Sequence, residues 1–388
     1  MRESRRMAEV QTPIIPIVGD LVRATPGTIS LGQGMVGYGP PRQAVEAAAR
    51  AGADLKTHQY GAVEGTSALR EALAAKLRAE NGIAIGPENR VVVTAGGNMA
   101  FLNAILAVAD LGDEIMLQTP CYFNHDMAIG MAGCRTICVP TDDQYQLRLD
   151  AIERAITPRT RAIVTVSPNN PTGAVYPEGA LRAVNELCRA RGIYHVHDEA
   201  YEYFTYGGIR PFAAGAIAGS AAHTISLYSF SKAYGFAGWR IGYMVIPEHL
   251  AVAVRKIQDT NLICPPMASQ AAALGALKAG AGYCREKTRG LSEVREIARQ
   301  AFGEIASFCA APMTDGAFYL FLRLSSALEP MALVERLVRE HKVAAIPGTA
   351  FGIAEGCTLR VAFGALEKET AAEGIGRLVR GLKAIVKG

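Results

Sequence analysis

A single lysine in the middle of the chain stands in surroundings that suit chemistry better than solvation. Lys232 lies in the run SFSKAYGFAGWR (229–240), directly after the apolar segment TISLY (224–228), and the next charged residue is Arg240. Burial disfavours the charged form of an amine and lowers its pKa, so that the neutral amine can act as a nucleophile or a base. Taken alone, the segment equally fits a lysine at a strand end that extends its ammonium group to solvent.

A second candidate lies in the predicted strand IYHVH (193–197). His195 and His197 alternate onto one face of that strand, as a pair of metal ligands does, and Asp198 follows them. A metal-dependent hydrolase is therefore one alternative. The chain has only seven histidines and no further cluster of histidines and carboxylates, which weighs against a metal site.

Short β-rich runs alternate with helical patterns through the middle of the chain. The runs are mostly apolar with little alternation, as strands covered on both faces are. Between them, SALREALAAKLRAENG (67–82) carries leucines at a spacing of four, and PEGALRAVNELCRARG (177–192) begins with Pro and ends with Gly. This alternation predicts a mostly parallel α/β sheet flanked by helices. The predicted strands are 91–94, 114–118, 162–167, 193–197, 224–229 and 240–246.

The character of the sequence changes after about residue 285. Long helical patterns and short β-rich runs there predict a smaller α+β domain. We expect a large domain over 41–284, a small domain over 285–388, and a segment 1–40 that packs with the small domain or forms an arm. The elements expected in the small domain are a helix over 285–309, a β-rich run over 316–324, a helix over 328–341, the short strands VAAI and TLRVAF, and a closing helix.

Composition excludes several classes of function. The chain has 40 basic and 36 acidic residues, and a net charge of +4 is too weak to indicate a nucleic acid or an anionic membrane as partner. The eight cysteines are scattered without a CxxC pair, which favours a reducing cytoplasm. The amino terminus is not a signal peptide, because acidic and polar residues and two prolines interrupt its apolar residues. The charge-free stretches 91–109 and 211–231 are too interrupted by Gly, Ser, Asn or His to be membrane helices.

In chain order, the motifs around Lys232 resemble those of the class I/II aminotransferases, the pyridoxal-phosphate enzymes of fold type I. The resemblance runs from about Leu31 to the C-terminus and implies transaminase activity, pyridoxal 5′-phosphate as cofactor, and a large cofactor-binding domain with a mostly parallel central sheet beside a small α+β domain. The motifs are TAGGN (94–98), PCYFNH (120–125), SPNNPTG (167–173), HVHDEAY (195–201), SFSKAYGFAGWR (229–240) and LRVAFG (359–364).

The resemblance assigns roles around the cofactor ring. Lys232 matches the lysine that bonds the cofactor aldehyde and then moves the substrate proton. Asp198 matches the carboxylate that keeps the pyridine nitrogen protonated, while Tyr201 and Asn170 match the hydrogen-bond partners of the phenolic oxygen. Tyr122 matches the aromatic ring that stacks on the cofactor. Without the resemblance, Asp198 equally fits a helix cap, the NPTG segment a structural turn and Tyr122 core packing.

The phosphate group of the cofactor needs several donors. Gly96, Gly97 and Asn98 open a helix after a predicted strand, where bare backbone N–H groups and the helix dipole can meet a dianion. Ser229 and Arg240, at −3 and +8 from the lysine, match the hydroxyl and guanidinium contacts of the family. A glycine pair at such a junction is common, and Arg240 also fits a surface residue at the start of a strand.

Further residues match positions near the substrate and the partner subunit. Tyr60 resembles the tyrosine that a second subunit lends to the phosphate, which implies a homodimer. Arg360 matches the arginine that binds the substrate α-carboxylate, and Gly34 matches a place where the substrate approaches the backbone. His125 fits a position behind Asp198.

The amino donor is less constrained than the reaction. Asn98 stands where aspartate-type bacterial relatives often carry a lysine, and SLGQGMVGYGPP (30–41) carries Met35 and Tyr38, which offer an apolar or aromatic wall. Together with HQYGAVEGTSALREAL and AYEYFTYGG, these features resemble the branch of the family that acts on aromatic amino acids and methionine. The resemblance implies such a donor in a ping-pong reaction with a 2-oxoacid. The alternatives are an aspartate-type aminotransferase, a C–S lyase or decarboxylase of the same fold, and a cofactor-binding regulatory module.

Overall fold

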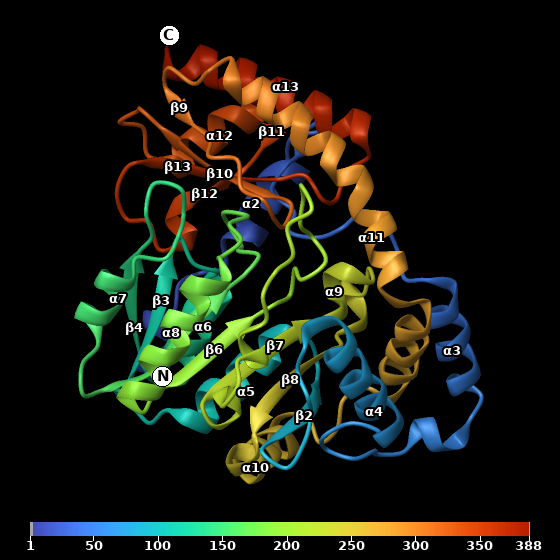
Figure 1. Cartoon of the computed structure of the whole chain (residues 1–388). Coiled ribbons are helices and arrows are strands. Elements are labelled where there is room, and N and C mark those ends of the chain that lie inside the picture. The colour runs from blue at the N-terminus through green and yellow to red at the C-terminus, as the bar shows by residue number, and fades with distance from the viewer. Residues whose placement is uncertain (1–2, 388) are drawn as a thin grey trace.

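The larger part of the chain is built on a mixed sheet that is parallel except for one strand (Figure 1). The computed structural model describes residues 3–387, and within them seven strands follow the order β2-β8-β7-β6-β5-β3-β4. Only β8 is antiparallel to its neighbours. The strands are β2 (Asn89–Thr94), β3 (Glu114–Thr119), β4 (Arg135–Pro140), β5 (Thr160–Val166), β6 (Tyr194–Asp198), β7 (Thr224–Ser229) and β8 (Gly242–Pro247).

Helices cover both faces of this sheet, which explains the continuous apolar runs of its strands. One face packs against α5 (Gly97–Val108), α6 (Phe123–Met131) and α10 (Ala251–Asn261). The other packs against α4 (Ser67–Lys76) and α11 (Met267–Gly303) at one end, and against α7 (Leu149–Ala155) and α8 (Glu178–Arg191) at the other. The helix α3 (Arg42–Gly52) lies on α11. In the described part of the chain, no helix is long and apolar enough to cross a membrane.

All six predicted strands are present, and the prediction missed the edge strand β4. Its sequence RTICVP is mixed and largely exposed, so it lacks the apolar signal of the central strands. The predicted helix 67–82 is found as α4 followed by one wider turn, and Gly82 ends it in the left-handed conformation at φ 71°.

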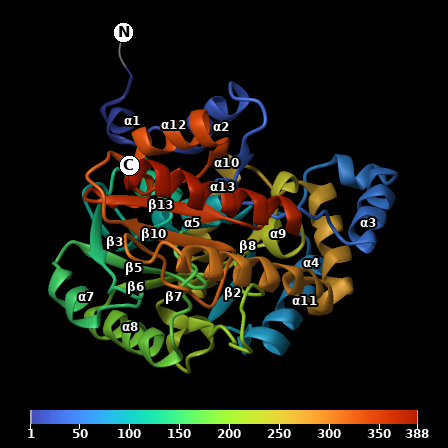
Figure 2. The ribbon, with the colours of Figure 1, turned by 90° about the horizontal axis from the view of Figure 1, so that it is seen from above.

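A smaller α+β unit follows, as predicted (Figure 2). Its antiparallel sheet has the order β12-β13-β10-β9, and the N-terminal β1 pairs with β11 in a separate parallel pair. Figure 2 also shows α2, from the start of the chain, beside α12. The elements are α1 (Arg5–Glu9), α2 (Ile14–Arg23), β1 (Ile29–Ser30), β9 (Cys309–Ala310), β10 (Tyr319–Leu324), α12 (Pro330–His341), β11 (Val343–Ala344), β12 (Ile346–Pro347), β13 (Cys357–Ala362) and α13 (Lys368–Val386).

The structure corrects the bounds of the helix predicted over 285–309. In the structure α11 begins at Met267 and ends at Gly303, and only Gly280 within it has non-helical dihedral angles (φ 71°, ψ −178°). The first half, MASQAAALGALKAG, is so rich in small residues that its helical periodicity is weak in the sequence. The helix therefore crosses the position at which we expected the small domain to begin.

Candidate active site

The predicted motifs meet at one edge of the seven-stranded sheet. Strands β2, β5, β6 and β7 all end there, and β8 begins there, because Ser229 and Thr94 are both paired with Gly242. Ligands of α/β proteins bind at this edge. A cavity of about 130 Å³, named the central cavity below, opens between the strand ends. It is lined by Gly97, Asn98, Tyr122, Val166, Asn170, Asp198, Ala200, Tyr201, Ser229, Ser231, Lys232 and Arg240.

Lys232 lies in a short helix, α9 (Phe230–Ala233), directly after β7. Its Nζ donates a hydrogen bond of 2.6 Å to the carbonyl oxygen of Gly34. Burial, together with the nearby guanidinium groups of Arg360 and Arg240, lowers the pKa of the amine to about 8. A substantial fraction of the amine is therefore neutral near pH 7 to 8, as a nucleophile requires.

Asp198, the last residue of β6, is held from both sides. Its Oδ1 accepts a hydrogen bond of 2.9 Å from the backbone N–H of Ala200, and its Oδ2 lies 3.1 Å from Nε2 of His125. His125 is 2% exposed and stacks on Phe101 at a centroid distance of 3.9 Å. The carboxylate is thus fixed in position at the wall of the central cavity.

A tyrosine that the sequence analysis missed completes the group around Tyr201. The Tyr201 hydroxyl lies 2.8 Å from the hydroxyl of Tyr319 and 3.4 Å from Nδ2 of Asn170. Burial raises the pKa of both tyrosines, that of Tyr319 to about 12, so both are protonated donors. Tyr319 begins β10 of the smaller unit, and the only signal in the sequence was an aromatic residue in the apolar run GAFYLFLRL.

Arg360 is a buried cation without an acidic partner among residues 3–387. Its side chain donates from Nη1 to Oδ1 of Asn170 (3.1 Å) and from Nη2 to the carbonyl of Gly32 (2.7 Å), while Nε has no partner. Burial lowers its pKa. A guanidinium group that is 2% exposed is costly unless an anion joins it, and its planar fork matches a carboxylate.

Backbone geometry shapes the end of the cavity near α5. Gly96 has φ 88°, and a Cβ built on it would lie 2.5 Å from Nη2 of Arg240, so a larger residue would displace the guanidinium. Arg240 itself has φ 53°, a left-handed conformation that is costly for a side-chain-bearing residue. The N–H groups that open α5, two serine hydroxyls and this arginine form a set of donors suited to a phosphate.

Four predicted site residues do not line the central cavity: Gly96 and Arg360, described above, and Gly34 and Tyr60. Gly34 lies beside it: a Cβ there would be 2.9 Å from the Tyr319 hydroxyl, so only glycine leaves this space open. Tyr60 is 80% exposed on the surface of the chain. Its predicted contact requires a second subunit.

His195 and His197, the metal ligands of the hydrolase alternative, are buried in the core of the sheet and contact polar side chains there. Thr165 Oγ1 lies 2.7 Å from both His195 Nε2 and His197 Nδ1, and Asn185 Nδ2 lies 3.1 Å from His195 Nδ1. Burial lowers the pKa of both rings, that of His197 to about 4. Within the described residues, no group of three or more His, Cys, Asp or Glu side chains is placed to hold a metal ion. The structure gives the hydrolase alternative no support.

The donor set of the central cavity fits pyridoxal 5′-phosphate. A buried amine is available for its aldehyde, a fixed carboxylate for its ring nitrogen, neutral hydroxyl and amide groups for its phenolic oxygen, and a helix N-terminus with an arginine for its phosphate. The orphaned Nε of Arg360 adds a place for a substrate carboxylate. Fold and site together define a pyridoxal-phosphate enzyme of fold type I.

Comparisons with known proteins place the chain within this class. Residues 26–378 match the family "Aminotransferase class I and II", and the chain belongs to this family. It is 33% identical to an aromatic aminotransferase of Arabidopsis thaliana over 99% of this chain and 97% of the relative. It is 36% identical to the aspartate/prephenate aminotransferase of Thermus thermophilus over 83% of each. A solved structure of a Thermus thermophilus aspartate aminotransferase mutant superposes with a TM-score of 0.90 at 32% identity, covering 98% of this chain and 100% of that one.

The protein is therefore an aminotransferase with pyridoxal 5′-phosphate as its cofactor, and its substrates are an amino acid and a 2-oxoacid. Relatives that act on aromatic amino acids and on aspartate or prephenate are similarly close, so the family alone does not decide the donor.

Proposed function

We propose that Lys232 carries the amino transfer and that the preferred donor is an aromatic amino acid or methionine, with a 2-oxoacid as acceptor in a ping-pong reaction. The observation that supports the role of Lys232 is its position: a buried amine with a pKa lowered to about 8, in a cavity shared with Asp198 and Tyr201. The neutral amine would bond the cofactor and take the proton from the substrate α-carbon.

The groups around Lys232 support the reaction by fixing charges. When bound, the cofactor draws electrons from the substrate α-carbon. Asp198 would hold a proton on the ring nitrogen, and His125 together with the Ala200 amide holds that carboxylate in place. Tyr201 and Asn170 would donate to the phenolic oxygen, and Tyr122 would face the ring.

Arg360 is proposed to bind the substrate α-carboxylate. It is buried, its Nε is unpartnered, and it lies beside Gly34, whose lack of a side chain leaves room for the substrate. Asn170 accepts from Arg360 and donates toward Tyr201, so it couples the substrate end of the site to the cofactor end.

An apolar wall supports an aromatic or methionine donor. Met35, Tyr38 and Trp239 line a hollow of about 610 Å³ that also contacts Arg240. The Tyr38 hydroxyl donates a hydrogen bond of 3.0 Å to the carbonyl oxygen of Lys232, which fixes its ring next to the catalytic lysine. Aromatic and thioether side chains gain most from such a wall. Aspartate is the second candidate donor, because the chain is also similar to the aspartate/prephenate aminotransferase of Thermus thermophilus.

A homodimer is proposed for the surface around Tyr60. This residue is 80% exposed, Leu55 is 73% exposed and Ile263 is 41% exposed. The amide of Gly61 donates a hydrogen bond of 3.3 Å to Sγ of Cys264, so the segments that carry these residues are neighbours. Exposed apolar side chains gathered in this way suit an interface with a second copy, which would bring Tyr60 to the neighbouring phosphate site.

The experiment is a spectral titration of the holoenzyme with single L-amino acids and no acceptor. The visible band of the bound cofactor should disappear, with growth of the near-ultraviolet band of its aminated form, and Phe, Tyr and Met should act at lower concentrations than Asp and Glu. A preference for Asp would overturn the donor assignment and leave the transaminase intact. Loss of carbon dioxide or of a thiol from the substrate would instead identify the decarboxylase or lyase alternative.

A further inference from the structure

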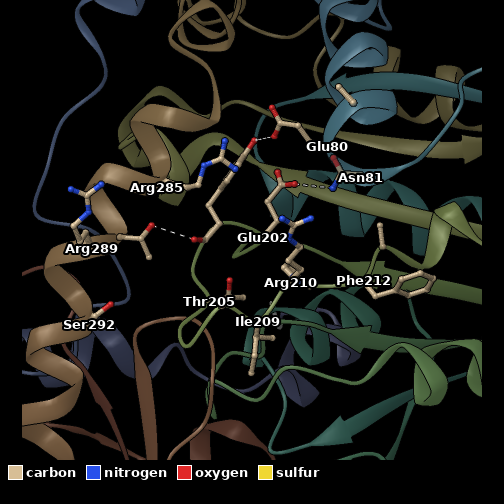
Figure 3. A pocket seen from close by; sticks show the side chains of 16 residues that line it. Glu80, Asn81, Glu202, Thr205, Ile209, Arg210, Phe212, Arg285, Arg289 and Ser292 are labelled. Atoms are coloured by element: carbon tan, nitrogen blue, oxygen red, sulfur yellow. Dashed lines mark hydrogen bonds between the residues drawn. The ribbon is translucent and has the colours of Figure 1, made fainter.

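Figure 3 shows a second and larger cavity, whose lining shares no residue with that of the central cavity. It has a volume of about 710 Å³ and lies between α11, the residues 79–81 that follow α4, and the segment 202–213. We name it the arginine cavity. Its lining includes Glu202, which directly follows Tyr201 of the central cavity. The two cavities therefore share one continuous stretch of chain.

Three arginines face this cavity from two walls. Figure 3 shows Arg285 and Arg289 on α11 and Arg210 on the facing loop. Arg285 and Arg289 are one helical turn apart and so lie on the same face of the helix. Within residues 3–387 none of the three forms an ion pair or a hydrogen bond through its side chain. Like charges one turn apart repel each other, and nothing in the cavity neutralises them.

Many other helix arginines are paired. Several have an acidic partner one turn away, as Arg182 has in Glu178 (2.7 Å) and Arg336 in Glu340 (2.8 Å). On α11 itself, Arg295 is paired with Asp315 at 3.2 Å. Arg285 and Arg289 thus differ from these paired arginines, including one on their own helix.

The carboxylates near the arginines are already engaged. Glu293, one turn after Arg289, pairs with Lys368 at 2.5 Å. Inside the cavity, Glu80 accepts a hydrogen bond from the Tyr203 hydroxyl. Glu202 accepts from Lys76 and from Nδ2 of Asn81, the latter at 2.9 Å. The cavity keeps an excess of positive charge that no neighbouring side chain removes.

We propose that the arginine cavity is a binding site for a small polyanion, either a di- or tricarboxylate or a phosphate compound. Its volume is in the range of small-molecule sites, about 300 to 1,000 Å³. Guanidinium groups bind carboxylate and phosphate oxygens in pairs, and arginines from two walls can hold two anionic groups at once. Ser292, three residues after Arg289, adds a hydroxyl to the same face. The proposal does not depend on the assignment of the amino donor.

The test is calorimetric titration of the holoenzyme with two probes, citrate for the carboxylate class and inorganic pyrophosphate for the phosphate class. At least one probe should bind, and the variant Arg285→Gln/Arg289→Gln should bind it about tenfold more weakly or worse, because charge-assisted hydrogen bonds are lost. Arg210→Gln should weaken the same probe from the other wall. The probe that responds identifies the class of ligand.

The matched control is Arg299→Gln, which removes an exposed arginine of α11 that is paired with Glu296 outside the cavity. Its affinity for the probe should equal that of the wild type. The proposal is overturned if neither probe binds at millimolar concentration, if the double variant and Arg210→Gln bind as the wild type does, or if Arg299→Gln weakens binding equally. The visible band of the bound cofactor verifies that each variant is folded. If the double variant does not fold, the binding of the probe to Arg210→Gln alone tests the proposal.

Discussion

The central cavity and the arginine cavity are lined by neighbouring residues of the segment 198–203. The two cavities differ in whether their charged side chains have partners within the protein. In the central cavity each charged group has a designated neighbour: the Lys232 amine meets the Gly34 carbonyl, and Asp198 meets His125. In the arginine cavity the three arginines face solvent, and none of them is paired with an acidic side chain of residues 3–387.

The difference follows from burial. A desolvated charge is tolerated only when neighbours satisfy it, so the central cavity is held in one geometry before any ligand arrives. Exposed guanidinium groups can stay solvated without such partners, so those of the arginine cavity remain free for the proposed anion. Substitutions in the central cavity should therefore have large effects on the reaction, while those near the arginine cavity should have small ones.

The largest effect is expected at the lysine. Lys232→Ala should remove the visible cofactor band and lower the rate of amino transfer by about four orders of magnitude or more, because both the bond to the cofactor and the proton carrier are lost. Absorbance and a coupled transaminase assay measure the two effects. Lys256→Ala, an exposed lysine of α10, is the control. Normal turnover by Lys232→Ala would refute the role of this residue.

The next largest effect is expected at Arg360. Arg360→Gln should raise KM by about a hundredfold for every amino acid tested, because a paired, charge-assisted contact with the common α-carboxylate is lost. Initial-rate kinetics with Phe and Asp measure this. Arg299→Gln again provides the control for the loss of one arginine. An increase confined to one class of amino acid would mean that Arg360 binds a side chain instead.

A moderate effect is expected from pH on the apoprotein. Burial lowers the pKa of Lys232 to about 8, so protonation blocks its reaction with the cofactor below that pH. The rate of pyridoxal 5′-phosphate capture should rise about tenfold for each unit of increasing pH up to about pH 8. Above that pH the rate should no longer change. Stopped-flow absorbance follows the capture. A rate that keeps rising up to about pH 10 would show an amine with the ordinary pKa.

The smallest effect is expected between the two cavities, at Glu199. This carboxyl accepts a hydrogen bond of 2.6 Å from Tyr228, and burial raises its pKa to about 8 from 4.5. The folded state then binds more protons than the unfolded state between these values, so stability is lost as pH rises through that window. The variant Glu199→Gln has no carboxyl group at this position, so this loss of stability with pH should not occur in it. Its Tm relative to wild type should rise by about 2 °C or more between pH 5 and pH 8, and a constant difference would contradict the shift.

Local patterns were sufficient to predict the framework of the site. The apolar strands and the polar residues that follow them placed Asp198, Asn170 and Lys232 at one sheet edge, because parallel strands end together. The edge strand β4 was missed for want of an apolar run, and α11 was predicted to start too late because small residues gave it little periodicity.

Contacts between segments that are distant in the sequence could not be predicted from local patterns. Tyr319 reaches Tyr201 only because β10 of the smaller unit packs over the sheet edge, and a β-rich run by itself does not reveal which strand end it will meet. The arginine cavity shows the same limit. The spacing of Arg285 and Arg289 is visible in the sequence, but Arg210 joins them only through the tertiary fold.

The segment 198–203 also bears on the directed evolution of this enzyme. Asp198, Glu199, Tyr201, Glu202 and Tyr203 are each tied to a partner elsewhere in the chain, so a mutational library over these positions would consist mainly of inactive or unfolded variants. The hollow beside Tyr38 offers more freedom, because Met35 is 43% exposed and forms no side-chain hydrogen bond in the described residues. New donor preferences are best sought there.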